Sequence, residues 1–365
     1  MGRSITEIPA SNNVSSEVAI GSYADVFMEG SKYRLPGVAL PVINYPDLSA
    51  VFLKSIVDYS FFTSTLTAVD VAFGNGIFVA ISSDGKTKVT TDGYTWTAGT
   101  APLPSGQISS ITFGNGLFVA VITLNATASI LTSPDGITWT VRTNPIAVNT
   151  WNDVVFANGL FVAVGTGVNT ASASTNVVTS TDGITWTSRT CVSGFWSTVT
   201  YGNGVYVALG GKSGTTTNIA MTSPDGIIWT SQTMASTLTW YGITYGNGVF
   251  VAVGGNPSTQ CNTSPDGITW TSRVLGASLT YTTVLFDGTL FLAMANTGTN
   301  AYTSPDGITW TARTVIANTW TGAVSANGIV IAVGGTTGAV IFMPKTNNAS
   351  YVYLTGTAGK FIKVK

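Results

Sequence analysis

The clearest pattern along the chain is a short run of apolar residues that follows a Gly-Asn-Gly turn. One such run is 117–121, which comes directly after Phe113, Gly114, Asn115 and Gly116. Glycine and asparagine tolerate positive φ, so this turn joins two strands in a tight hairpin. An apolar run without alternation is typical of a strand that is buried on both faces. Helical periodicity is absent, and we expect an all-β protein.

The hairpin phrase occurs seven times, in steps of 39 to 45 residues. A second phrase, Ser-Pro-Asp-Gly-Ile-Thr-Trp or a near copy, follows the first six copies, and its Pro and Gly suit a turn between two further strands. Four strands in such a repeat make one blade of a propeller. The sequence therefore predicts a seven-bladed β-propeller of four-stranded blades. The seven copies start at Phe73, Phe113, Phe156, Tyr201, Tyr245, Phe286 and Ser325.

The last blade needs a strand from another part of the chain, because the seventh copy lacks the second phrase. The stretch 55–62 is strand-like and precedes Phe73 by the distance that separates each repeat Trp from the next blade. We expect it to close the ring beside three strands from about 319–343, which removes the open edge. The predicted domains are an N-terminal segment 1–53, the propeller 54–345 and a C-terminal hairpin 346–365.

Composition narrows the classes of partner. Charged residues make up 8% of the chain and its net charge is −1, so no basic patch is present for a nucleic acid. No apolar run approaches the roughly 18 residues of a membrane helix. Cys191 and Cys261 fall at different points of non-adjacent repeats, which disfavours a disulfide. We expect neither a cofactor nor a metal site.

The second phrase resembles the Asp box of the sialidase-like propellers, although it is one residue shorter between Asp and Gly. In that family the box is structural. A sialidase-type active site needs an arginine cluster, an acid and a glutamate that activates the nucleophile. The glutamates of this chain are Glu7, Glu17 and Glu29, all before the propeller, and histidine is absent. We therefore expect a protein that is not an enzyme, with a glycosidase or depolymerase as the least favoured alternative.

Three residue types recur at fixed positions of the repeat, and we favour structural roles for them. The box aspartates are either weak cation sites or, as we prefer, turn residues that accept backbone N–H groups. The box tryptophans would fill the gaps between adjacent blades. Four arginines stand three residues after a box tryptophan, which is a periodic position rather than a convergent one. These residues are Asp92, Asp135, Asp182, Asp225, Asp266 and Asp306; Trp96, Trp139, Trp186, Trp229, Trp270 and Trp310; and Arg142, Arg189, Arg273 and Arg313.

A second aromatic series stands five residues before the hairpin phrase in five consecutive blades. Its members are Trp151, Trp196, Trp240, Tyr281 and Trp320, whereas the first two blades have Ala68 and Ile108. A purely structural demand would recur in every blade. We therefore expect these side chains to stand exposed near one mouth of the central channel, where they would stack on sugar rings. The alternative is that they plug the channel or pad the top of the blades.

The N-terminal segment carries a different likeness. The stretches 27–37 and 43–52 resemble a segment common in tail-fibre and tail-collar proteins of bacteriophages, and 359–365 is similar to the closing strand of such proteins. Pro46 would open a short helix with Leu48 and Phe52 on one face. The resemblance implies that this segment docks onto other virion proteins, and its candidate docking residues are Tyr33, Tyr45, Pro46, Leu48 and Phe52.

These observations together predict a non-enzymatic phage virion surface protein, a tail fibre or a decoration protein. The N-terminal segment would dock in the particle as part of a homo-oligomer, and the propeller would face outward for adhesion to a host surface polysaccharide. The start of the chain shows no apolar stretch of the signal-peptide type, so we expect assembly in the host cytoplasm. The main alternative is a purely structural head or tail decoration protein.

Overall fold

The computed structural model describes residues 60–63, 68–344, 350–353 and 361–364, apart from short loop segments at 94, 101–106, 124–129, 147–149, 168–172, 212–215, 256, 316–317 and 336–338. The chain divides into two compact units. One comprises 1–59 with 344–365, and the other comprises 60–343. The candidate docking residues Tyr33, Tyr45, Pro46, Leu48 and Phe52 lie outside the described residues.

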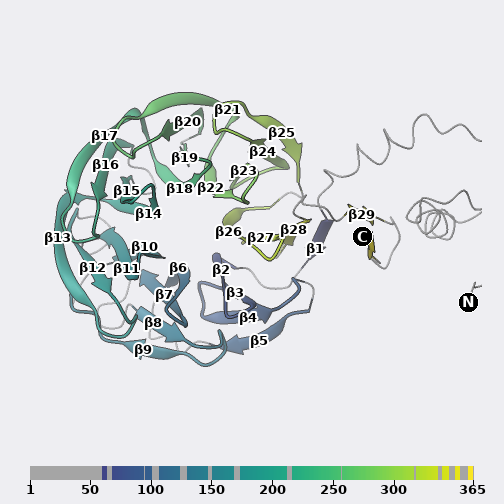
Figure 1. Cartoon of the computed structure of the whole chain (residues 1–365), viewed down its shortest axis with the longest axis horizontal. Helices are drawn as coiled ribbons and strands as arrows, with labels where there is room; N and C mark the ends of the chain where they lie inside the picture. The colour runs from purple at the N-terminus through teal and green to yellow at the C-terminus, as the bar shows by residue number, and fades with distance from the viewer. Residues whose placement is uncertain are drawn as a thin grey trace, which may run out of the picture. The chain divides into compact units, whose positions relative to one another are not determined.

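Every element among the described residues is a β-strand, and the unit 60–343 is an all-β propeller of four-stranded blades (Figure 1). Six blades each consist of four consecutive strands. The first two are blade 1 (β2 Asp70–Gly74, β3 Ile77–Ile81, β4 Lys86–Thr90, β5 Thr97–Thr100) and blade 2 (β6 Gln107–Gly114, β7 Leu117–Thr123, β8 Ile130–Ser133, β9 Thr140–Arg142). The next two are blade 3 (β10 Thr150–Ala157, β11 Leu160–Thr166, β12 Ser174–Ser180, β13 Thr187–Gly194) and blade 4 (β14 Trp196–Gly202, β15 Val205–Gly210, β16 Thr217–Ser223, β17 Thr230–Leu238). The last two are blade 5 (β18 Trp240–Gly246, β19 Val249–Gly254, β20 Ser258–Ser264, β21 Thr271–Leu279) and blade 6 (β22 Tyr281–Phe286, β23 Phe291–Ala295, β24 Asn300–Ser304, β25 Thr311–Thr314).

One further four-stranded sheet combines the two ends of this unit. It contains β26 (Trp320–Ala326), β27 (Ile329–Gly334), β28 (Ala339–Pro344) and, from before the first repeat, β1 (Ser60–Thr63). β1 pairs antiparallel with β28, and Phe61 lies opposite Ile341. This sheet, which we call the closing sheet, therefore receives its outer strand from the stretch that the sequence predicts.

Two described strands near the C-terminal end of the sequence pair with each other. β29 (Ser350–Tyr353) pairs antiparallel with β30 (Phe361–Val364), and the two make a two-stranded sheet of their own.

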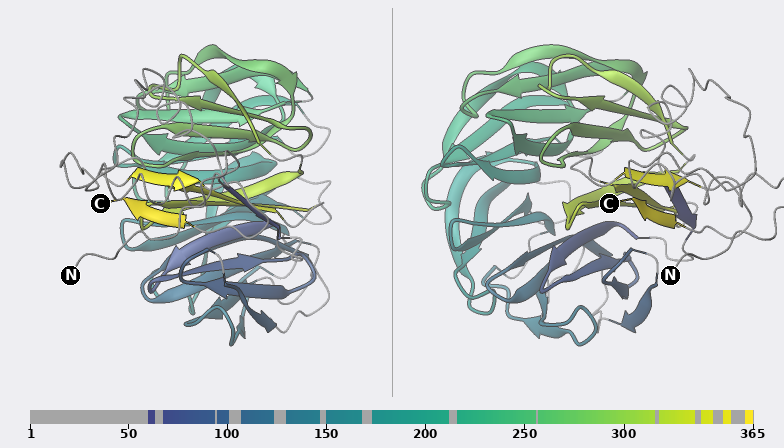
Figure 2. Two further views of the ribbon diagram at one scale, coloured as in Figure 1. Left: turned by 90° about the vertical axis from the view of Figure 1, so that its right-hand side faces the viewer. Right: turned by 45° about the vertical axis from the view of Figure 1, so that its right-hand side comes forward.

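The first strand of each blade lies at the centre of the ring and the last strand lies at its rim (Figure 1). Each inner strand contacts the inner strand of the next blade, and β26 of the closing sheet contacts β2 of blade 1. The views in Figure 2 show the blades following one another in chain order. Phe118, Val119, Ala120 and Val121 of the second strand of blade 2 are 0% exposed, which confirms that the apolar runs are buried on both faces.

The Gly-Asn-Gly phrase forms the expected tight turn, and its two glycines have different roles. In blade 4, Asn203 and Gly204 have φ values of 49° and 79°, as a turn between adjacent antiparallel strands requires. Gly202 instead makes room for the next blade, because a Cβ atom there would lie 2.1 Å from Cγ of Tyr245. Where its first glycine is present, the phrase therefore couples the hairpin to its neighbour as well as turning the chain.

The turn asparagines also join neighbouring blades. Asn203 Nδ2 of blade 4 donates to the carbonyl oxygen of Pro265, in the box turn of blade 5, at 3.1 Å. Asn75, Asn115 and Asn247 make the same kind of bond to the box turn of their own next blade. The Gly-Asn-Gly turns and the box turns therefore lie at the same face of the propeller.

Candidate functional sites in the propeller

The second aromatic series is completely buried. Each of its five members is the first or second residue of an inner strand, as the sequence predicts, but each is 0% exposed. The expectation that they stand exposed is wrong, so none of them offers a ring face to a sugar. The members are Trp151 in β10, Trp196 in β14, Trp240 in β18, Tyr281 in β22 and Trp320 in β26.

Cross-strand pairing gives the physical reason for this burial. Trp196 lies opposite Gly210 in the neighbouring strand and is followed by a β-bulge before Thr198. Its indole Nε1 donates to the carbonyl oxygen of Val192 at 3.0 Å, so the ring packs under the connection into its own blade. The other four aromatics lie opposite a glycine or an alanine: Gly165, Gly254, Ala295 and Gly334.

This pairing also explains why blade 2 lacks an aromatic. Ile108 of blade 2 lies opposite Ile122, and both are almost fully buried. A bulky pair of equal residues therefore replaces the large and small pair of the later blades. The signal was present in the sequence as a small residue at the end of each following strand, and it marks core packing.

The box aspartates are turn residues, as preferred from the sequence. In blade 2, Asp135 Oδ1 accepts the N–H groups of Thr138 and Ile137 at 2.7 and 2.8 Å and the hydroxyl of Ser133 at 3.0 Å. The N–H group of Thr138 contributes most to holding the pKa of Asp135 below its usual value. Asp182, Asp225, Asp266 and Asp306 repeat the arrangement. Among the described residues, no group of three or more potential metal ligands occurs.

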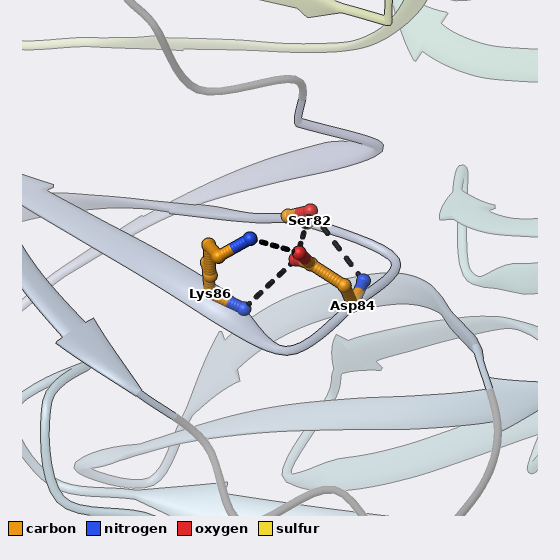
Figure 3. Close-up of polar contacts among 3 residues, drawn as sticks. All are labelled: Ser82, Asp84 and Lys86. Carbon is orange, nitrogen blue, oxygen red and sulfur yellow. Dashed lines mark hydrogen bonds and ion pairs between the residues drawn. The ribbon is translucent and has the colours of Figure 1, made fainter.

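A related turn joins β3 to β4 in blade 1 (Figure 3). Ser82 Oγ donates to Asp84 Oδ1 at 2.6 Å, and Lys86 Nζ pairs with the other carboxylate oxygen. The hydrogen bond from Lys86 is the main cause that lowers the pKa of Asp84 to about 2. In the part of the chain that the structure describes, this is the one ion pair.

The box tryptophans and the periodic arginines make regular contacts in the blades. Trp139 belongs to a core cluster that spans blades 1 and 2, and its Nε1 donates to the carbonyl oxygen of Gly136 at 3.0 Å. Arg189 Nε donates to Thr179 Oγ1 across its own blade at 3.2 Å, and Arg142, Arg273 and Arg313 do likewise. Cys191 and Cys261 are free thiols, and burial raises the pKa of each to about 12.

A surface groove lies where the repeat is broken between blades 3 and 4. Its volume is about 560 Å³, and its lining includes Arg189, Cys191 and Val192 from β13 and Ile228 and Trp229 from the next box turn. Ile228 stands where the other boxes have Thr and is 69% exposed. We call this feature the blade 3–4 groove.

Cys191 explains why the groove is open. The position five residues after the box tryptophan holds Met234, Leu275 and Val315 in blades 4 to 6, and each of them is at most 3% exposed. Cys191 occupies this position in blade 3 with a smaller side chain that is only partly buried. Cys191 and Ile228, which differ from their counterparts in blades 5 and 6, therefore meet at this groove.

Polar residues at the centre of the ring form a cluster that the sequence reasoning missed. Asp70, Ser110, Asp153 and Thr198 occupy the same position of the inner strand in blades 1 to 4, three residues before the hairpin phrase. Ser110 Oγ lies 3.0 Å from Asp70 Oδ2 and 2.8 Å from Asp153 Oδ1. Gly242, Thr283 and Gly322 occupy the position in the remaining sheets. An alignment of the seven repeats at this position would have shown the two carboxylates.

The carboxylates bind inner strands of neighbouring blades. Asp70 Oδ2 accepts the N–H group of Ile111 at 2.9 Å, and Asp153 Oδ2 accepts that of Val199 at 2.8 Å. Burial, against the opposing influence of these bonds, raises the pKa of Asp70 to about 7 and that of Asp153 above its usual value. The cluster therefore links blades 1 to 4.

No helix among the described residues is long and apolar enough to cross a membrane. No protein-family model matches the chain, and no curated protein matches it in sequence.

Solved propellers with diverse functions are similar to the chain in fold. YCF48 bound to D1 peptide is 14% identical with a TM-score of 0.61, over 80% of this chain and 96% of that one. Virginiamycin B lyase from Staphylococcus aureus is 10% identical with a TM-score of 0.66, over 78% and 98%. The Neurospora crassa Pan2 WD40 domain is 7% identical with a TM-score of 0.62, over 80% and 96%. At these identities the likeness shows a β-propeller fold and nothing about function.

Proposed function

We propose that the chain is a non-enzymatic surface protein of a phage virion, whose N-terminal segment docks onto other virion proteins and whose propeller adheres to the host surface. The first half rests on the resemblance of 27–37 and 43–52 to phage tail-fibre and tail-collar segments. The second half rests on the blade 3–4 groove. A homo-oligomer would present several copies of such a groove, and binding through several weak sites gains strength by avidity.

The groove carries the adhesion proposal because Cys191 and Ile228, which both differ from their counterparts in blades 5 and 6, line the same place. The charge and the apolar surface of the groove indicate which class of ligand would bind there. Arg189 lies in the groove without a carboxylate partner among the described residues, beside the apolar Val192 and Ile228. A guanidinium next to apolar surface suits a sugar that presents a carboxylate together with its apolar ring face. The proposed ligand is an acidic polysaccharide of the host surface.

The propeller of this proposal is a ring of seven blades, with the closing sheet as the seventh. The pairing of β1 with β28 supports this count, as does the contact between β26 and β2. Thr321 of the closing sheet adds a side-chain link, because its hydroxyl donates to the carbonyl oxygen of Ala68 at 3.1 Å. A closed ring leaves only the short outer strand of each blade as a sheet edge.

The test is adsorption of the labelled full chain to host cells and to extracted acidic polysaccharide. Arg189→Gln removes the charge and keeps a bond to the strand, because Gln232 makes the equivalent bond to Thr222 at 3.0 Å in blade 4. We expect this variant to lose saturable binding by at least about tenfold, as the loss of a charged hydrogen bond implies. Arg273→Gln in blade 5 is the matched control and should bind normally. Equal binding by both variants would exclude the groove.

Two repeat-restoring substitutions give a second test. Cys191→Met fills the groove as Met234 does in blade 4, and Ile228→Thr restores the common box sequence. The double variant should fold normally and fail to adsorb. Ile268→Thr removes an exposed isoleucine from blade 5 and should leave adsorption unchanged.

A purely structural decoration protein is the second candidate, and the burial of the five aromatics favours it. Because these side chains are buried, the propeller lacks the exposed sugar-binding aromatics that the sequence suggests. This candidate predicts that particles lacking the propeller adsorb normally, and that no variant of the groove changes adsorption.

A further inference from the structure

The contacts of Ser110 with Asp70 and Asp153 contain one hydrogen too few if both carboxyl groups are ionised. The hydroxyl of Ser110 has one hydrogen, yet its oxygen lies within hydrogen-bond distance of carboxylate oxygens of both Asp70 and Asp153, at 3.0 and 2.8 Å. One contact uses the hydroxyl hydrogen. The other would place two oxygen atoms with lone pairs against each other if both carboxyl groups were ionised.

The two carboxyl groups are half-buried at the centre of the ring, and no positively charged side chain of the described residues pairs with either of them. Ser110 is 5% exposed, and the closing sheet packs against Asp70 so closely that a Cβ atom on Gly322 would lie 2.4 Å from Asp70 Oδ1. The charged group that acts on Asp70 is Asp153 itself, and neither forms an ion pair with a lysine or arginine of the described residues. From β14, the cluster meets the hydroxyl of Thr198 and the N–H group of Val199, which both donate to Asp153 Oδ2.

We propose that Asp70, Ser110 and Asp153 together bind one shared proton, and that loss of this proton weakens the centre of the ring. In the protonated state, one carboxylic acid donates to Ser110 Oγ and the serine hydroxyl donates to the other carboxylate. When the proton leaves, two negative charges face each other across a single hydroxyl, on the inner strands that hold blades 1 to 3 together. The proton goes to solvent, and no other group changes its bonding.

The direction of the pKa shifts sets the pH dependence. The pKa of Asp70 is raised from 3.8 to about 7, mainly by burial, so the folded state holds a proton that the unfolded chain has released above about pH 4. Stability from this proton is complete below the unfolded pKa and is lost as the pH rises through the folded pKa. Between those limits the unfolding equilibrium constant should rise about tenfold per pH unit, and it should level off above pH 7.

Few other groups of this chain titrate in the same pH range. The chain contains no histidine, and burial raises the pKa values of both thiols to about 12. A proton that is released between about pH 5 and 7 during chemical unfolding of the full chain is therefore assigned to the carboxyl pair.

The experiment measures unfolding by denaturant of the full chain from pH 4.5 to 8.5, for the wild type, Asp70→Asn and Asp153→Asn. Each single substitution should abolish the tenfold-per-unit dependence, because either acid alone can accept from Ser110 without conflict. Ser110→Thr keeps the hydroxyl that Thr198 supplies in blade 4, and Asp266→Asn changes a carboxylate whose pKa is lowered. Both of these variants should keep the dependence. A dependence that survives in Asp153→Asn would overturn the shared proton.

A spectroscopic measurement covers the case in which an Asn variant does not fold. In the wild type, carboxyl resonances of ¹³C-labelled aspartate should show two groups that titrate together, with a midpoint well above the usual aspartate pKa. If every aspartate signal completes its titration below pH 5, the proposal fails.

Discussion

Asn203 Nδ2 donates a hydrogen bond of 3.1 Å to the carbonyl oxygen of Pro265, which joins the first turn of blade 4 to the box turn of blade 5. The bond depends on the turn itself, because the left-handed φ of 49° at Asn203 directs this short polar side chain toward the next blade. Asparagine therefore serves here both as a residue that tolerates positive φ and as a donor between blades.

Replacement of Asn203 by glycine should separate these two roles. Glycine keeps the turn without strain and removes the donor, so Asn203→Gly should lower the free energy of unfolding by about 1 kcal/mol. Asn158→Gly is the matched control, since Asn158 has the same positive φ and makes no such bond to a described residue. Denaturant unfolding of the two variants should differ by about that amount, and equal losses would assign the effect to glycine entropy.

Substitution of Gly202 tests the contact between successive hairpins. A methyl group there meets the ring of Tyr245, so Gly202→Ala should destabilise the protein by about 1–3 kcal/mol through overpacking. Blade 3 already holds Ala157 at this position, so Ala157→Gly removes a methyl group instead. That control should change stability by less than about 1 kcal/mol in thermal unfolding. A loss of similar size in both variants would contradict the packing argument.

Truncation of Trp196 distinguishes core packing from sugar binding. Because the indole is fully buried, Trp196→Ala should cost about 3–5 kcal/mol of stability. Adsorption should fall only in proportion to the unfolded fraction, measured on the same sample by tryptophan fluorescence. Specific loss of adsorption in a fully folded variant would restore a binding role for this residue.

Removal of β1 tests the closing sheet. A chain that starts at residue 68 leaves β28 without its partner, and the loss of the four-residue pairing should cost about 2–4 kcal/mol. The free edge should also promote self-association, which size-exclusion chromatography detects. A chain that starts at residue 60 retains β1 and is the control. If both truncated chains unfold alike, β1 does not stabilise the ring.

The box turns should make the propeller sensitive to strong acid. Backbone N–H groups, led by that of Thr185, lower the pKa of Asp182 to about 2. A depressed pKa contributes stability above the unfolded value, and this contribution is lost as the pH falls from about 4 toward 2. Asp182→Asn should reduce the steepness of acid unfolding followed by circular dichroism, whereas Asp70→Asn should leave that acid limb unchanged. The opposite result would assign acid sensitivity to the ring centre.

The repeat made most of the fold readable from the chain. Gly-Asn-Gly, the apolar run after it and the box each specify a local hairpin, because turn chemistry and burial act over a few residues. The missing box in the last copy was enough to predict that a strand near Ser60 joins β28. The structural roles of Asp135 and Trp139 followed from their periodicity, since a residue present once per blade meets the same neighbours each time.

Tertiary structure decided which unusual residues face solvent. The sequence suggests that Trp196 is a surface aromatic, because the series to which it belongs is missing from two blades. The side chain is in fact buried, and it fits because Gly210 lies opposite it in the neighbouring strand. The blade 3–4 groove depends on Cys191 and Ile228, which meet only when two blades pack. Asp70 and Asp153 are 83 residues apart and share Ser110 because neighbouring inner strands converge at the ring centre. A sequence pattern specifies local turns and buried runs, whereas contacts between blades depend on the size and polarity of residues that the ring brings together.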